Sequence, residues 1–406
     1  MTIEQEVERQ FLAITEQADE VVPEAELREK LHRSIASGTP LRVKYGIDPT
    51  NPSIHIGHLV PCRLIRTFQE LGHRAVLIVG DYTAQIGDPT GRNKERPGLT
   101  QEEVTANMER YIDQLSVVVD VSQAEVHYQS EWFGSASLAK VLTVLSRFSV
   151  AQMLAHETFR SRIEAGTRLS LHELAYPVLQ AEDSVQVTAD VEIGGTDQRF
   201  NCLCGRDLQR ASGLDPQVVI TVPLLPGTDG AKMSKSMDNH ISVELPATEI
   251  VGRVMSLADE WIPLYARLAV GWPRAKREQF ITRIEAGALH PRDAKLELAR
   301  AIAEELHGTQ AAAKAVEEFE RVFSRRDAPS EIAALAVNGT RRAVVEVLQE
   351  VGFAASKSEG RRLIAQGGVR IDGVRVEHVE AVINLTREGT LVQVGKRRFV
   401  RVSARG

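Results

Sequence analysis

Two short strings, about 175 positions apart in the chain, have the residue types of a phosphate-binding site. The first is His55-Ile56-Gly57-His58, and the second is Lys232-Met233-Ser234-Lys235-Ser236. The two imidazoles are three residues apart, so they share one face at a helix start, where unpaired N–H groups and the positive end of the helix dipole attract anions. Gly57 lacks a Cβ that would block the close approach of a nucleotide.

The second string adds two ammonium groups. Lys232 and Lys235 are also three residues apart, on a loop preceded by Gly230. Positive charge placed where pyrophosphate departs stabilises a transition state without proton transfer. Each string alone has a simpler interpretation, a helix cap or a solvated turn. Their order, spacing and flanking strands favour one shared site for adenylate formation from ATP, in which an ionised carboxylate attacks without a catalytic base.

The first string lies in a predicted strand–loop–helix–strand unit. Apolar alternation over residues 41–47 predicts a strand, and the proline-rich residues 48–52 end it. Apolar residues at helical spacing over 60–71 predict a helix, and the apolar run 75–79 predicts a strand buried on both faces. This is a βαβ unit with the histidines at the carboxyl edge of the sheet, where open α/β folds bind ligands.

The remaining pattern predicts several domains, because 406 residues exceed one ordinary hydrophobic core. Residues 148–187 are largely helical in pattern, short strands follow at 191–193 and 218–222, and the pattern from 247 to 323 is mainly helical. We expect an α/β fold with a Rossmann-like catalytic domain at 1–228, the lysine-bearing loop at 229–245, a helical domain at 246–325, a linker at 326–339 and a small α+β domain at 340–406.

Charge is distributed unevenly along the chain. The net charge is −6, but residues 341–406 hold 13 Lys/Arg against 7 Asp/Glu, so this segment carries +6 and the rest carries −12. A basic tail on an acidic body indicates that the tail meets a polyanion.

The three cysteines, with no second Cys-x-Cys pair or nearby His cluster, predict no metal site. No apolar run reaches 18 residues, so we expect neither secretion nor membrane spanning. We expect a cytoplasmic location instead.

Further strings connect these features to a known family. They are Gly46 to Thr50 running into the histidine string, Ile86 to Pro89, Phe148 to Val150, Ser161 to Ile163, Tyr176 to Asp183, Gly194 to Gln198, and the lysine loop. Over residues 41–240 the chain thereby resembles the class I aminoacyl-tRNA synthetases, and specifically the bacterial tyrosyl-tRNA synthetases. The histidine and lysine strings are shared by the whole class and imply the reaction, whereas the Tyr176 and Gly194 strings imply tyrosine.

The resemblance implies a role for each matching residue. Catalytic groups would be His55, His58, Lys232 and Lys235, and ATP would contact Gly46, Asp48, Thr50, Gly57, Gly195, Asp197, Lys235, Arg92 and Arg96. Tyrosine would be held by Asp88, Tyr176, Gln180, Asp183 and Gln198, with Gln198 orienting its carboxylate and Asp183 accepting its phenol hydroxyl. Magnesium would accompany ATP, with no protein-bound structural metal.

Two observations bear on tyrosine selectivity. Tyr176, Gln180 and Asp183 have the spacing of one helical face, so one helix could line one pocket. Many family members carry a tyrosine two residues before Gly46 as a second phenol partner, but this chain has Lys44, as in a second bacterial branch. A site that binds the hydroxyl rejects phenylalanine by leaving polar groups unpaired, a discrimination for which tyrosyl enzymes are the standard example. The second phenol partner stays open.

The tail resembles a small RNA-binding fold of a ribosomal small-subunit protein, through residues 356–362 and 368–373. Lys357, Arg361 and Arg362 would approach phosphates and position the RNA without reading its sequence. The implied partners are tRNA(Tyr), tyrosine and ATP, with the chain as a homodimer.

Two other functions compete with this interpretation. A tryptophanyl-tRNA synthetase would share the fold and both strings, but residues 194–198 and the Gln180/Asp183 pair argue against it. A non-catalytic RNA-binding paralogue is opposed by the intact histidines and lysines of the two strings.

Overall fold

The computed structural model describes residues 1–406 except 91–97, 235–236, 324–333, 387–388, 396–397 and 406. Arg92, Arg96 and Lys235, three of the residues predicted to contact ATP, lie outside the described residues. The chain divides into two compact units, residues 1–309 and 310–406. The domain limits expected within 1–325 stay predictions.

The first unit is built on a six-stranded sheet. Its strands are β1 (Glu20–Val22), β2 (Arg42–Ile47), β3 (Arg74–Val79), β4 (Glu125–Tyr128), β5 (Val191–Gly195) and β6 (Val218–Val222), in the order β1-β6-β5-β2-β3-β4. All neighbours are parallel except β1, which is antiparallel to β6. The predicted parallel sheet is confirmed.

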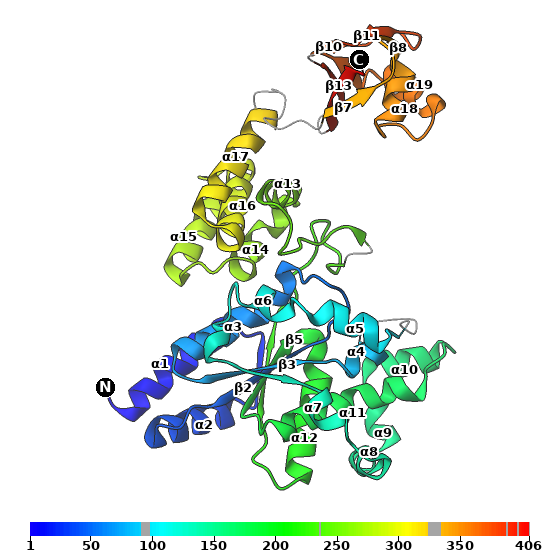
Figure 1. Cartoon of the computed structure of the whole chain (residues 1–406). Coiled ribbons are helices and arrows are strands. Elements are labelled where there is room, and N and C mark those ends of the chain that lie inside the picture. The colour runs from blue at the N-terminus through cyan, green and yellow to red at the C-terminus, as the bar shows by residue number, and fades with distance from the viewer. Residues whose placement is uncertain (91–97, 235–236, 324–333, 387–388, 396–397, 406) are drawn as a thin grey trace. The chain divides into compact units, whose positions relative to one another are not determined.

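Two crossovers define the ligand-binding edge of this sheet. Helix α3 (Leu59–Glu70) connects β2 to β3 and packs on both, and helix α12 (Arg199–Ala211) does the same for β5 and β6. Because β3 and β6 lie on opposite sides of the central β2–β5 pair, right-handed crossovers place the two helices on opposite faces of the sheet (Figure 1). The chain therefore diverges after β2 and β5 and leaves a crevice at their carboxyl ends.

Helix α11 (Leu171–Gln186) forms one wall of this crevice. It begins at Ser170, whose side chain and that of Glu173 form a capping box. Glu173 also forms a buried ion pair with Arg162, at 2.5 Å. Packing of α11 against α12 fixes the helix face that carries the predicted pocket residues.

The first unit also contains the helices α1 (Ile3–Thr15), α2 (Glu24–Ser37), α4 (Thr83–Ile86), α5 (Gln101–Met108), α6 (Tyr111–Leu115), α7 (Ser130–Phe133), α8 (Leu138–Leu145), α9 (Val150–Met153) and α10 (Glu157–Glu164). The helical pattern predicted from residue 247 is also present, as α13 (Ala247–Met255), α14 (Ile262–Leu268), α15 (Arg274–Glu285), α16 (Pro291–His307) and α17 (Thr309–Phe323). The division between the two units falls at the start of α17.

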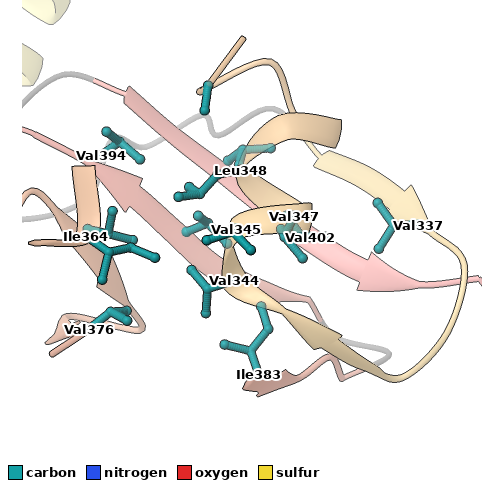
Figure 2. Packing of buried hydrophobic residues seen from close by; sticks show 14 of the residues in the cluster. Val337, Val344, Val345, Val347, Leu348, Ile364, Val376, Ile383, Val394 and Val402 are labelled. Atoms are coloured by element: carbon teal, nitrogen blue, oxygen red, sulfur yellow. The ribbon is translucent and has the colours of Figure 1, made fainter. Parts of the chain in front are cut away.

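The second unit ends in a small α+β domain. Its elements are β7 (Ala334–Val337), β8 (Arg341–Ala343), α18 (Val344–Glu350), α19 (Lys357–Ala365), β9 (Val369–Ile371), β10 (Val374–Arg375), β11 (Val382–Asn384), β12 (Thr390–Val394) and β13 (Arg398–Ala404). Val344, Val345 and Leu348 of α18 point toward the strands that carry Val394 and Val402 (Figure 2). The predicted two helices followed by short strands are confirmed.

The predicted linker, residues 326–339, is too long at its carboxyl end. Residues 334–337 form strand β7, which pairs in parallel with β13 and so belongs to the sheet of this domain. The segment Ala-Leu-Ala-Val is short and contains one β-branched residue, so its strand depends on the distant partner strand and leaves little local signal. Residues 326–333 lie outside the described part of the chain.

A buried ion pair joins the central strands β2 and β5. Lys44 is 0% exposed and Glu192 is 2% exposed, and Lys44 Nζ lies 2.9 Å from Glu192 Oε1. The same ammonium donates to Ser184 Oγ at 2.7 Å and to the carbonyl oxygen of Gln180 at 3.0 Å. Charges buried this deeply are tolerated only when they are paired and hydrogen-bonded.

We predict that Lys44→Met destabilises the first unit by about 3–5 kcal/mol, because it leaves the Glu192 carboxylate buried without its cation. The double variant Lys44→Met/Glu192→Gln should recover most of this loss. Urea titration with tryptophan fluorescence as the signal measures the stability of each variant, since Trp132, Trp261 and Trp272 all lie in the first unit. A single variant as stable as the wild type would show that the pair does not hold these strands.

Candidate active site

A cavity of about 660 Å³ opens at the carboxyl edge of the sheet. Its walls come from the loops after β2 and β5, the start of α3, one face of α11 and residues 231–234. Every described residue predicted to act in catalysis or to bind ATP or tyrosine lines it: Gly46, Asp48, Thr50, His55, Gly57, His58, Asp88, Tyr176, Gln180, Asp183, Gly195, Asp197, Gln198 and Lys232. Segments far apart in the sequence therefore meet at one site, although the role of each residue stays a prediction.

The histidine string forms one end of the cavity. His55 and His58 have ring centroids 3.9 Å apart, and His58 Nδ1 accepts a hydrogen bond from the backbone N–H of His55 at 3.2 Å. A Cβ at Gly57 would lie 2.9 Å from His55 Nδ1, so any other residue here would require this imidazole to shift. The predicted placement of both imidazoles at the start of a helix is found, with a 3-10 turn over Ile56–His58 leading into α3.

The lysine loop is joined directly to this end. The backbone N–H of Ile56 donates to the carbonyl oxygen of Ile241, and His55 forms an antiparallel bridge with Ser242. Asn239, 2% exposed, accepts from the N–H of Ser234 and so holds the loop from within. The histidine string is thus joined by backbone hydrogen bonds to residues 241–242 of the lysine-bearing loop.

Lys232 spans the mouth of the cavity. Its Nζ lies 2.9 Å from Asp197 Oδ2, while its side chain is 62% exposed. An ion pair this exposed contributes little to stability, so a phosphate group can displace Asp197 at small cost.

Acidic and amide groups also line the cavity. Tyr176 donates its hydroxyl to Asp48 Oδ2 at 2.8 Å, and Gln198 Nε2 donates to Asp88 Oδ2 at 2.6 Å. Gln180 Nε2 donates to Glu192 Oε1 at 3.1 Å. Burial raises the pKa of Tyr176, and the carboxylates of Asp48 and Asp88 add to this, so the hydroxyl stays protonated and donates. Such an arrangement suits a substrate ammonium group.

Asp183 lies on the same α11 face and is 2% exposed. Its Oδ2 accepts from Gln129 Nε2 at 2.8 Å and its Oδ1 accepts from Trp132 Nε1 at 3.2 Å. Burial raises the pKa of this carboxyl to about 7, although the Lys44 charge opposes the shift. An ionised Asp183 retains acceptor capacity on the cavity side, because each carboxylate oxygen has two lone pairs.

Other residues also line the cavity, and among them the polar groups of Gln129 and Glu192 were not predicted to act in the site. Gln129 directly follows β4, so the rule that ligands meet the carboxyl ends of parallel strands could have indicated it had β4 been recognised. Glu192 and Lys44 are single charges inside apolar strands, and two such charges in neighbouring strands indicate a buried pair.

The three predicted RNA-contacting residues lie on or at the start of α19 in the second unit. Lys357, Arg361 and Arg362 are all exposed, and each lies within 4 Å of a glutamate, at 2.7, 3.9 and 3.6 Å respectively. These surface pairs are weak and leave the cations accessible to a phosphate backbone.

The residues that the structure describes contain neither a metal-binding cluster nor a helix that could span a membrane. No group of three or more His, Cys, Asp or Glu side chains there could hold a metal ion. None of the helices in that part of the chain is long and apolar enough to cross a membrane.

Comparison with known proteins defines the class. The family model of class I tRNA synthetases (W and Y) matches residues 36–324, and the S4 domain model matches residues 344–381. The solved tyrosyl-tRNA synthetase of Archaeoglobus fulgidus in complex with L-tyrosine has a TM-score of 0.61 at 24% identity, covering 76% of this chain and 99% of that chain, which shows a shared fold.

Curated relatives narrow the class. The tyrosine–tRNA ligase of Moorella thermoacetica is 44% identical over 401 residues, covering 98% of this chain and 97% of that protein. The tyrosine–tRNA ligase of Thermotoga maritima is 41% identical over 397 residues, covering 98% of each. The chain belongs to the tyrosine–tRNA ligase family, which confirms the predicted resemblance.

The raised pKa of Asp183 predicts a pH dependence of stability. Its carboxyl ionises near pH 7 when folded and at about 4 when unfolded. Between these values the folded state holds the proton that the unfolded state has released, so stability falls as pH rises. We therefore expect the unfolding free energy of the wild type minus that of Asp183→Asn to fall from pH 4 to pH 7 and then to level off. Urea titrations at each pH measure this difference. A difference independent of pH contradicts the assignment.

Proposed function

We propose that this protein activates tyrosine with ATP, releasing pyrophosphate, and then transfers tyrosine from the adenylate to the 3′-terminal adenosine of tRNA(Tyr). The main support is that one cavity is lined both by the two histidines and Lys232 and by Asp183. The first group suits a triphosphate and the second suits a phenol, and the same cavity is also lined by residues that suit an ammonium and a carboxylate.

The proposed activation step needs positioning and charge. Gln198, held by Asp88, orients the tyrosine carboxylate toward the α-phosphate, and Tyr176 and Gln180 hold the ammonium. The imidazoles of His55 and His58 lie beside the N–H groups at the helix start, where negative charge develops. Lys232 leaves Asp197 to meet the departing pyrophosphate. Mg²⁺ would arrive with ATP, since phosphates and waters usually supply most of its ligands, and it would offset phosphate charge.

The tRNA is proposed to contact the basic tail. The S4 domain match spans α18 and α19, and Lys357, Arg361 and Arg362 supply exposed cations there. Such contacts would hold the phosphate backbone and position the acceptor end without selecting bases.

A cytoplasmic homodimer is also proposed. Large apolar side chains are exposed on α8 to α11: Leu138 (74%), Leu142 (55%), Val150 (66%), Ile163 (51%) and Leu171 (85%). These helices pack together through one apolar cluster, so their exposed side chains belong to one region of the first unit. Exposed apolar surface of this kind marks interfaces, and a twofold axis would let one such face cover its own copy.

Exchange of radiolabelled pyrophosphate into ATP, run with each of the twenty amino acids, tests the proposed activation step. We expect exchange above background with tyrosine alone, because Asp183 and its neighbours are arranged for a phenol. Exchange with tryptophan would support the tryptophanyl alternative. A lack of exchange with every amino acid would support the non-catalytic paralogue.

Removing the carboxyl-terminal α+β domain should separate tyrosine activation from transfer to tRNA. Truncation after residue 333 removes β7 together with its sheet, whereas truncation after 339 would leave β7 without its partner β13. Pyrophosphate exchange should stay within about twofold of wild type, while tyrosylation of tRNA should fall by about 10- to 100-fold because phosphate contacts are lost. As a matched full-length control, the triple variant Lys357→Gln/Arg361→Gln/Arg362→Gln should reproduce the transfer defect. Loss of exchange on truncation would place part of the activation site in the tail.

A further inference from the structure

We propose that Gln129 is the second partner of the substrate phenol: its side-chain amide donates a hydrogen bond to the phenol oxygen while Asp183 accepts one from the hydroxyl. The proposal rests on the proposed function and deepens it, because it names the group that completes tyrosine recognition where Lys44 replaces the tyrosine of many relatives.

A buried phenol needs two partners of opposite kind. Its hydroxyl is a donor, and its oxygen is also an acceptor. An ionised Asp183 can serve only the donor, since a carboxylate has no hydrogen to give. An oxygen buried without a donor forfeits its hydrogen bonds to water, which costs about 1–3 kcal/mol.

Lys44 is not available as that donor. An ammonium group has three hydrogens, and those of Lys44 point to the Gln180 carbonyl, Ser184 and Glu192, at 3.0, 2.7 and 2.9 Å. Lys44 is also not among the residues that line the cavity. Trp132 has one N–H, and this hydrogen is directed at Asp183.

Gln129 is held in the orientation that the proposal requires. Its Oε1 accepts from the backbone N–H of Thr83 at 2.9 Å and from the backbone N–H of Tyr82 at 3.2 Å. Two backbone N–H donors on one side of the amide identify that side as oxygen, so the NH₂ group faces the other way.

The NH₂ group of Gln129 has one hydrogen to spare. One hydrogen goes to Asp183 Oδ2 at 2.8 Å, and no second acceptor for Nε2 is found among the residues that the structure describes. Gln129 is 1% exposed and lines the cavity, so its remaining hydrogen has no route to bulk water except through the cavity. An oxygen bonded to Asp183 on the cavity side lies next to this nitrogen.

Phenylalanine would leave both groups unpaired. Without a hydroxyl, Asp183 keeps a buried charge with unused acceptor sites, and Gln129 keeps a buried donor. Gln129 and Asp183 would therefore act as a pair that reads the hydroxyl through both of its hydrogen-bonding roles.

The test is the selectivity of pyrophosphate exchange in Gln129→Met, which preserves side-chain length and removes the amide. We expect kcat/KM for tyrosine to fall about 10-fold, the value of one hydrogen bond near 1.4 kcal/mol, while kcat/KM for phenylalanine stays within about twofold. In this variant kcat/KM for 4-aminophenylalanine should fall less than kcat/KM for tyrosine, because the amino group of this analogue donates to Asp183 but accepts poorly.

Gln186→Met is the matched control. Gln186 is an α11 amide bonded to Glu182 and is not among the cavity-lining residues, so the selectivity of this variant should equal that of wild type.

A purely structural role for Gln129 would lower kcat/KM for tyrosine and phenylalanine together, and this result, or an unchanged ratio, would overturn the proposal. If Gln129→Met does not fold, Gln129→Asn retains the amide but withdraws it by one methylene, and a smaller loss of the tyrosine-to-phenylalanine ratio is then expected; an unchanged ratio again overturns the proposal. A wild-type protein without tyrosine-dependent exchange would instead refute the proposed function, so the two failures are distinguishable.

Discussion

The divergence of the chain after β2 and β5 is the constraint on which the rest of the site depends. These neighbouring strands lead into crossovers on opposite faces of the sheet, so the loops that follow them must separate. The histidine string follows β2, and Asp197 and Gln198 follow β5. The buried Lys44–Glu192 pair joins the two strands beneath the crevice and also ties α11 to them through Ser184.

The lining of the cavity matches the two proposed substrates. His55, His58, Lys232 and the helix start line it, and so do Asp88, Asp183 and Glu192. In the proposed function a triphosphate meets the histidines and Lys232 and the phenol meets Asp183, so that the ammonium, the carboxylate and the α-phosphate lie between them. Backbone hydrogen bonds to residues 241–242 keep the histidine segment beside the loop that carries Lys232.

Much of this architecture could be predicted from local sequence. The βαβ unit has clear strand and helix periods, and the spacing of Tyr176, Gln180 and Asp183 indicates one helix face. Strands β1 and β7 escaped prediction because each has three or four residues and depends on a distant partner strand. Gln129 escaped because β4, the strand that it follows, also has only four residues, and its contacts with Thr83 and Asp183 join distant parts of the chain.

The role of Lys44 could not be predicted from the sequence. The resemblance leaves the second phenol partner open at this position. The structure shows that the ammonium of this lysine is committed to Gln180, Ser184 and Glu192, so the lysine supports the site from below. This difference follows from burial, which turns a side chain that is usually exposed into a fixed partner for a carboxylate.

A crystal structure of the protein with a non-hydrolysable tyrosyl-adenylate analogue is the most direct test of the proposed site. We expect one ligand in the cavity between α11 and the sheet, with the phenol oxygen in hydrogen-bonding contact with Asp183 and Gln129 and the adenylate beside His55 and His58. A ligand bound elsewhere, or bound with the phenol directed toward the histidines, would contradict the proposed site.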